Sequence, residues 1–231
     1  MLNGCNLLLA SFVLPESRTP NNEKIDLAAL NPLRPMQWVF SLKNLLPIVL
    51  IFFIFSATGE VYGTCWALWG NDVFQWNGVW IGLSLGAFGI CQTLAQVFLP
   101  GPAVGLLGER GAILTGIAGT CIALGIMALA TQSWTIFAIM PLLVLIGVGT
   151  PVLQSLATRQ VGENLQGQFQ GVLQSAVSLA SIIAPLVFSS FYFVFRERWP
   201  GAIWLLTIAM NGIGALLILR LRFKEPEMAV V

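Results

Sequence analysis

The sequence has no histidine, and only 9% of its 231 residues are charged, compared with about 25% in soluble domains. The absence of histidine excludes Ser-His and Cys-His nucleophile pairs and His-ligated metal sites. Eleven basic residues stand against ten acidic ones, so the chain lacks the positive field that attracts nucleic acid. We therefore expect no nucleic-acid partner, no metal, no cofactor and no enzymatic activity.

Cysteine is also scarce, with four residues that lie far apart and form no CxxC motif. This spacing argues against a zinc site and against a disulfide framework. Each cysteine sits in or beside an apolar run, where a free thiol packs as a small hydrophobic side chain. The four residues are Cys5, Cys65, Cys91 and Cys121.

Apolar residues, by contrast, make up 57% of the chain, and its mean hydropathy is +0.84. A helix needs about 20 apolar residues to cross the hydrocarbon core of a bilayer, and six runs meet this requirement. The strict alternation of a membrane barrel is missing. We therefore predict an all-α integral membrane protein with a six-helix transmembrane domain over residues 46–222. The runs are Leu46 to Gly70, Val79 to Leu99, Ala112 to Ala130, Ile136 to Thr158, Phe169 to Phe195, and Ala202 to Leu219.

The two ends of the chain differ from this domain. Residues 1–14 form a shorter apolar run, interpreted as the remnant of a preceding transmembrane helix, because its start lacks the Lys or Arg of a signal peptide. Residues 15–45 are mixed in charge and rich in Pro and Asn, which indicates a linker. Of the Lys and Arg residues, nine collect on one side of the predicted spans and only Arg196 and Arg198 on the other. The positive-inside rule then places the linker and the tail, residues 223–231, in the cytoplasm.

Polar residues recur at four-residue intervals within most spans, which places them on one helical face. Amides and hydroxyls need partners in hydrocarbon, so these faces are expected to share an interior. We interpret that interior as an aqueous solute pathway; the alternative is hydrogen bonding between helices without a pathway. The predicted pathway residues are Thr64, Gln92, Gln154, Gln174 and Asn211, and their stripes include Ser56, Ser84, Gln96, Thr150, Thr158, Gln170, Ser178 and Thr207.

Glu60 is the most informative single residue, because a carboxylate near the middle of a span costs about 2.5 to 3.5 kcal/mol on insertion scales. No Lys or Arg lies in any span to pair with it. Desolvation favours the neutral form of an acid, so we predict that Glu60 carries a proton. The alternatives are a site for a cationic solute and a protonated side chain that is hydrogen-bonded to a neighbouring helix.

Glycine and proline interrupt the fourth span at Gly147, Gly149 and Pro151, while Gly59 and Gly63 flank Glu60 in the first span. If the six spans form two inverted three-helix repeats, these positions correspond. Interrupted helices at corresponding positions of such repeats point to a binding site.

Several motifs resemble the C-terminal half of a Major Facilitator Superfamily transporter, in particular one of the tetracycline/proton antiporter group. They are the segment from Leu14 to Arg18 before a charged linker, Phe74-Gln-Trp-Asn77, the loop GPAVGLLGER at 101–110, Pro151 to Gln154, and Gln166 to Gly171. In that loop, Gly101, Gly108, Glu109 and Arg110 carry the similarity.

The resemblance implies half of a twelve-helix transporter in a bacterial-type inner membrane. It implies alternating access and proton-coupled efflux of a small amphipathic solute or drug, with the first, second, fourth and fifth spans lining the cavity. The implied partners are the lipid bilayer, the solute, protons, and an N-terminal six-helix half or a second copy. The alternatives are a truncated, non-transporting fragment, a membrane assembly subunit or, less in keeping with the residues, a polytopic membrane enzyme.

Two positions depart from the antiporter pattern. Alignment through Gly108 to Arg110 puts Thr120 where the antiporters carry an acidic residue, so either Glu60 takes over coupling or the substrate differs. Gly105 stands where the superfamily loop motif has an acid, which reduces the charge of the loop.

Overall fold

The computed structural model describes residues 45–161 and 165–221. In these ranges the chain folds into helices joined by short turns, and six segments are long and apolar enough to cross a bilayer. Six spans and an all-α fold are therefore confirmed. The predicted helix remnant, the linker up to residue 44 and the tail lie outside the described residues. The helices are α3 (Leu46–Phe74), α4 (Gly78–Phe98), α5 (Pro100–Leu129), α6 (Ser133–Leu143), α7 (Ile146–Arg159), α8 (Gln166–Phe195) and α9 (Ala202–Arg220), with α6 and α7 forming one span.

The boundary between α3 and α4 follows from local chemistry. Gln75 adopts a left-handed conformation, with φ 55°, and ends α3. Two residues later, the Asn77 side chain accepts a hydrogen bond from the backbone N–H of Trp80 at 3.1 Å, which caps the start of α4. The chain thus reverses within three residues, so α3 and α4 cross the membrane as consecutive antiparallel spans.

Residues 101–110, whose motif resembles a loop between two spans, form a short helix followed by a kink. α5 begins at Pro100, whose fixed φ suits the first turn of a helix. The direction of the chain changes at Gly108, with φ 70° and ψ 170°, a conformation that glycine adopts without steric strain. α5 continues from this kink to Leu129.

The fourth span is interrupted, but three residues earlier than Gly147, where the sequence had placed the first break. α6 ends at Leu143 and α7 begins at Ile146, and tight turns join them, with N–H groups donating to carbonyls three residues back. Gly147 and Gly149 lie inside α7. A Cβ added at Gly147 would come within 2.5 Å of the Gln92 amide nitrogen, so this glycine permits the close approach of α7 and α4.

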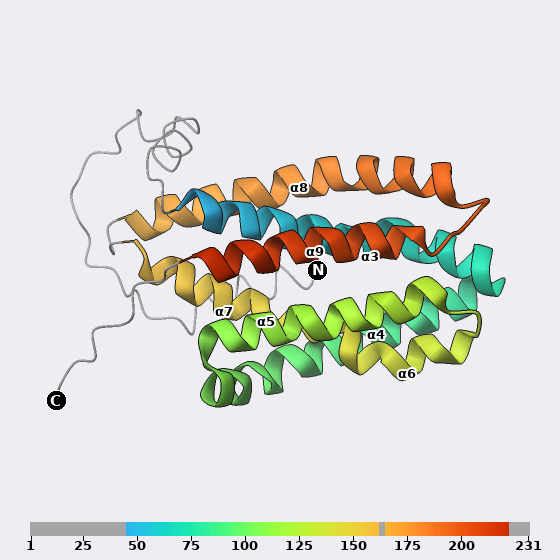
Figure 1. Ribbon diagram of the computed structural model, residues 1–231, viewed down its shortest axis with the longest axis horizontal. Coiled ribbons are helices and arrows are strands. Elements are labelled where there is room, and N and C mark those ends of the chain that lie inside the picture. Colours follow the sequence, from blue (N-terminus) through green and yellow to red (C-terminus); the bar gives the residue numbers. More distant parts are fainter. Residues whose placement is uncertain (1–44, 162–164, 222–231) are drawn as a thin grey trace, which may run out of the picture. The chain divides into compact units, whose positions relative to one another are not determined.

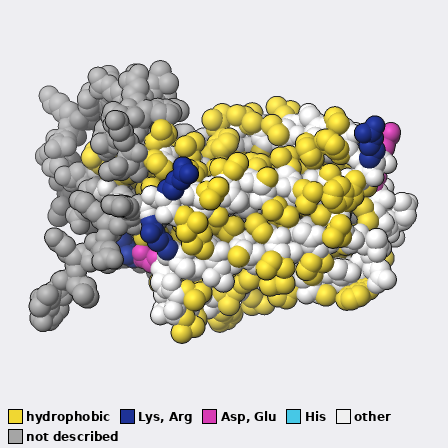
Figure 2. Space-filling view, in the orientation of Figure 1, with side chains coloured by type: hydrophobic (Ala, Val, Ile, Leu, Met, Phe, Trp, Pro, Cys, Tyr) yellow, Lys and Arg dark blue, Asp and Glu magenta, His cyan; other side chains and the backbone are white. Residues whose placement is uncertain are grey.

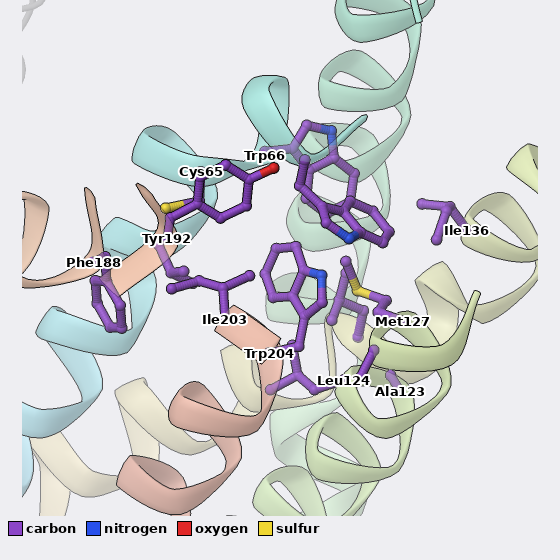
Figure 3. Close-up of a cluster of buried hydrophobic side chains, with 14 of the residues drawn as sticks. Cys65, Trp66, Ala123, Leu124, Met127, Ile136, Phe188, Tyr192, Ile203 and Trp204 are labelled. Carbon is purple, nitrogen blue, oxygen red and sulfur yellow. The ribbon is translucent and has the colours of Figure 1, made fainter. Parts of the chain in front are cut away.

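The helices divide into two packed groups (Figure 1). α3 packs along α8 and against α9, while α5 packs against α6 and α7. The most extensive contact between the two groups is that of α5 with α9. A core that includes Trp66, Trp69 and Trp204 fills one end of the bundle. Figure 3 shows Trp66 and Trp204 within it. An aliphatic core that includes Ile113 and Leu153 fills the other end.

Charged side chains on the face seen in Figure 2 lie at the two ends of the helices, and hydrophobic side chains cover the length between them. Large apolar residues such as Leu83, Ile90, Ile182 and Leu186 are exposed along α4 and α8. This distribution suits a protein whose middle is surrounded by lipid.

Candidate functional site

The polar stripe of α3 lies on the side of this helix that its neighbours leave partly uncovered. Ser56, Glu60 and Thr64 follow at intervals of four residues and are all partly exposed. Nothing lies within 4 Å of a Cβ added at Gly59 or Gly63 beside them. The Thr64 hydroxyl donates to the backbone oxygen of Glu60 at 2.8 Å, so it is satisfied within its own helix. The Glu60 carboxyl projects from a surface of small and hydroxyl-bearing residues.

The partner of Glu60 is a neutral hydroxyl on another helix. Ser181 of α8 donates to Glu60 Oε1 at 2.8 Å. The ion pairs found among the described residues join other acids to arginines, Glu109 to Arg159 and Asp72 to Arg196. In the described part of the chain, Glu60 is therefore held by hydrogen bonding without a compensating cation.

Ser181 belongs to a stripe of small and polar residues on α8 that is longer than the predicted one. Its members recur every three or four residues, as one face of a helix requires, and they are exposed or partly exposed. They are Gly167, Gln170, Gly171, Gln174, Ser178 and Ser181. Beyond Ser181, exposed apolar side chains such as Ile182 and Leu186 continue the four-residue spacing of Gln174 and Ser178. This face of α8 is therefore polar up to Ser181 and apolar beyond it.

The stripe of α8 also reaches α7. Gln154 of α7 donates to Gln170 Oε1 at 3.4 Å, and Thr150 and Thr158 lie one turn on either side of Gln154. The Thr158 hydroxyl donates to backbone oxygens of its own helix. Hydrogen bonds thus connect the polar stripes of α3, α8 and α7 along one continuous set of residues. We call this set the polar face: Ser56, Glu60, Thr64, Thr150, Gln154, Thr158, Gln170, Gln174, Ser178 and Ser181.

Two of the predicted pathway residues are placed differently. Gln92 is partly buried beside Gly147, and its buried Oε1 has no hydrogen-bond partner among the described residues. Asn211 of α9 is 0% exposed, and its amide donates to the backbone oxygen of Thr207 at 3.0 Å. The structure brings Glu60, Thr64, Gln154 and Gln174 onto the polar face, sets Gln92 between α4 and α7, and encloses Asn211 in the core.

The loop motif contacts the far end of α7. Glu109, directly after the Gly108 kink, forms an ion pair of 2.8 Å with Arg159 in the last turn of α7. Gly101 lies in the first turn of α5, and Arg110 is exposed. The positive φ of Gly108 changes the chain direction immediately before Glu109. The pair therefore links the kink to the end of the interrupted span.

Thr120, which stands where an acidic residue was expected, is buried in α5. Its hydroxyl donates to the backbone oxygen of Leu143 at 3.3 Å. The N–H of Gly147, which a continuous helix would direct to Leu143, bonds instead to Val144 at 3.0 Å. Thr120 therefore satisfies a carbonyl that the break between α6 and α7 leaves without its helical partner.

A second polar cluster joins α3 and α8 at their ends. Tyr192 donates to Asp72 Oδ2 at 2.6 Å, and Arg196 donates to Asp72 Oδ1 at 2.8 Å. The guanidinium also lies over the rings of Tyr192 and Phe193. Asp72 lies three residues before Gln75, in the last turn of α3.

Two partners, Ser181 and Arg159, were not predicted from the sequence. Ser181 continues the spacing of Gln174 and Ser178, so extending the stripe by three residues would have found it. Arg159 is one of the nine basic residues that lie on one side of the predicted spans. No sequence spacing links it to Glu109, because the two residues meet only when α5 and α7 pack.

Comparison with known proteins identifies the family. The pattern of the Major Facilitator Superfamily matches residues 48–230. This chain belongs to the Major Facilitator Superfamily. The breadth of the match, which extends over all six spans, agrees with the helical bundle described above.

Members of the Major Facilitator Superfamily that resemble this chain include curated tetracycline resistance proteins. The class C protein of Escherichia coli is 38% identical over 210 residues, covering 91% of this chain and 53% of the relative. The class G protein of Vibrio anguillarum is 36% identical over 219 residues, covering 95% and 54% respectively. The chain therefore spans about half the length of the curated relatives it matches.

Proposed function

We propose that this chain forms one six-helix half of a proton-coupled transporter that exports a small amphipathic solute, of the tetracycline type, from bacteria. The observation that carries the proposal is the polar face, with Glu60 hydrogen-bonded to a neutral residue inside a membrane span. A carboxyl group held in this way in hydrocarbon is a candidate proton carrier. The names of the relatives supply the class of solute.

The partner in this proposal is a second six-helix unit that covers the polar face. Amides and an acid facing lipid would be unfavourable, whereas a second unit would enclose them in a water-filled crevice. The two units would rock about this crevice, as inverted-repeat transporters do. The unit is an N-terminal half, in the same polypeptide or another, or alternatively a second copy of this chain.

The residues of the polar face have different roles in this proposal. Glu60 binds and releases the proton. It thereby replaces the acidic residue that the antiporters carry at the position of Thr120. Thr64, Gln154 and Gln174 form hydrogen-bonding walls for the solute. Gln92, whose buried oxygen lacks a partner among the described residues, borders the pathway between α4 and α7.

In this proposal the unit lies in the bacterial inner membrane. By the positive-inside rule, its linker and tail are on the cytoplasmic side. The Glu109–Arg159 ion pair would then lie on the cytoplasmic side and the Asp72–Arg196 pair on the outer side. Tests of sidedness with membrane-impermeant reagents would check this assignment.

The function is tested by expressing the chain together with the N-terminal half of the class C relative in a tetracycline-sensitive bacterium. Solute-driven proton movement is then measured in everted membrane vesicles. We expect Glu60→Gln to lower proton-coupled transport by about 100-fold, because a glutamine cannot exchange the proton. Glu197→Gln, the same change at an exposed residue between α8 and α9, should leave transport unchanged.

Two outcomes would contradict this proposal in different ways. Retained proton coupling in Glu60→Gln would remove Glu60 from the mechanism. Absence of any transport by the unmodified chain, despite correct insertion of both halves, would favour the alternative of a non-transporting membrane assembly subunit.

A further inference from the structure

The hydroxyl of Ser181 has two acceptors within reach. Its oxygen lies 2.8 Å from Glu60 Oε1 and 3.2 Å from the backbone oxygen of Val177. A serine hydroxyl carries a single hydrogen and two acceptor lone pairs. Ser181 can therefore donate fully to only one of these oxygens at a time, and rotation of the hydroxyl exchanges them without moving either helix.

The two arrangements match the two protonation states of Glu60. An ionised carboxylate only accepts hydrogen bonds, so Ser181 then donates to Glu60. A protonated carboxyl donates, so Glu60 then donates to the Ser181 oxygen, and the hydroxyl hydrogen turns to Val177. We propose that Ser181 is a positioning residue that holds the Glu60 carboxyl against α8 in both protonation states, an inference that rests on the proposed role of Glu60 in proton coupling.

The surroundings favour the hydroxyl over any charged group as the partner of Glu60. The remaining ionisable side chains of α3 are Tyr62, Cys65 and Asp72; α8 carries Tyr192 and α9 carries Arg220. The Asp72 carboxylate accepts hydrogen bonds from Tyr192 and Arg196. Asp72 itself lies about 18 Å along α3 from Glu60, at 1.5 Å per residue. Arg220 is the last residue of α9.

This arrangement bears on how the protein moves. If Ser181 keeps its contact with Glu60 before and after the proton leaves, the change of charge does not separate α3 from α8. The Asp72 cluster joins the same two helices without involving Glu60. α3 and α8 therefore move together, and the proton leaves through water on the exposed side of the carboxyl.

The test measures how the protonation of Glu60 depends on pH, without requiring transport. The purified full chain in phosphatidylcholine liposomes is treated with a hydrophobic carbodiimide, which reacts with protonated carboxyl groups. Glu60→Gln identifies the label that belongs to Glu60. Ser181→Ala removes a hydrogen bond from both forms of Glu60, but the bond to the ionised carboxylate is charge-assisted and therefore the stronger of the two. We expect the variant to move the midpoint of labelling upward by about one pH unit, because the ionised form loses more than the protonated form.

An isosteric pair separates the hydroxyl from side-chain size. Ser181→Thr keeps the donor and should keep the midpoint, whereas Ser181→Val should shift it as alanine does. Ser175→Ala is the matched control, because Ser175 is also exposed on α8 and donates to its own helix, at Gly171 O, 2.9 Å away. Its midpoint should equal that of the unmodified chain.

An unchanged midpoint in both Ser181→Ala and Ser181→Val would overturn the proposal, as would an equal shift in Ser175→Ala. The proposed function fails separately, because labelling does not need a partner half. If the midpoint shifts as expected but Glu60→Gln still transports protons, Ser181 positions Glu60 and the coupling role belongs to another residue.

Discussion

Polar residues at helical spacing occur in two parts of this molecule, and the two parts differ in how deeply these residues are buried. On α5 and α9, Thr120, Thr207 and Asn211 are fully buried and hydrogen-bonded to backbone oxygens. On the polar face, Glu60 and Gln174 stay at least partly exposed. The same spacing therefore serves internal packing in one region and an uncovered surface in the other. Periodicity identifies a polar side of a helix, but it does not say what lies opposite that side.

The difference between the two regions should affect stability most when an amide is replaced by an acid. Asn211→Asp introduces a carboxylate into a fully buried site with no cation among its described neighbours. We expect the free energy of unfolding to fall by about 3 kcal/mol at neutral pH. Gln174→Glu, the corresponding change on the polar face, should lower it by less than about 1 kcal/mol.

Unfolding of the purified variants by a denaturing detergent, followed by circular dichroism, measures both values. Equal losses in the two variants would mean that Asn211 and Gln174 share one environment. The distinction between the two regions would then be wrong.

A smaller effect is expected for two glycines, one packed immediately before α9 and one at an open position inside it. A Cβ added at Gly201 would lie 2.1 Å from the Ala128 backbone oxygen, which also accepts a bond from Trp199 Nε1. Gly201→Ala should therefore destabilise the protein by about 2 kcal/mol through overpacking. At Gly212, a Cβ has nothing within 4 Å, so Gly212→Ala should stabilise α9 by up to about 1 kcal/mol. A stabilising Gly201→Ala in the same unfolding assay would contradict this packing.

The spans were predictable because the bilayer thickness fixes the length of each helix. The second span was predicted as Val79 to Leu99, and α4 is Gly78–Phe98. The kink at Gly108 and the break after Leu143 were not located by this argument. Tertiary contacts accompany both, Glu109 with Arg159 beside the kink and Thr120 with Leu143 at the break, and hydropathy does not encode such contacts.

The candidate site was predictable in part for a similar reason. Glu60 stood out because an acid in an apolar run is energetically unusual. Its partner Ser181 lies 121 positions away, so only folding brings the two together. Asn211 and Gln174 could not be separated by sequence, because burial depends on which neighbouring helix covers each face.

The smallest effect tests whether a member of a predicted polar stripe has a structural role. Ser84 of α4 is buried, accepts a bond from Trp66 Nε1 at 2.9 Å and donates to Ile81 O. Ser84→Ala leaves the indole N–H without this acceptor, which should cost about 1 to 2 kcal/mol of stability. Ser178→Ala on the polar face should change stability by less than about 0.5 kcal/mol. The Trp66→Phe variant has no indole N–H, so Ser84→Ala should lower its stability less than it lowers that of the unmodified chain. An equal loss of stability in both backgrounds would mean that the hydrogen bond contributes nothing and that Ser84 acts only by its volume.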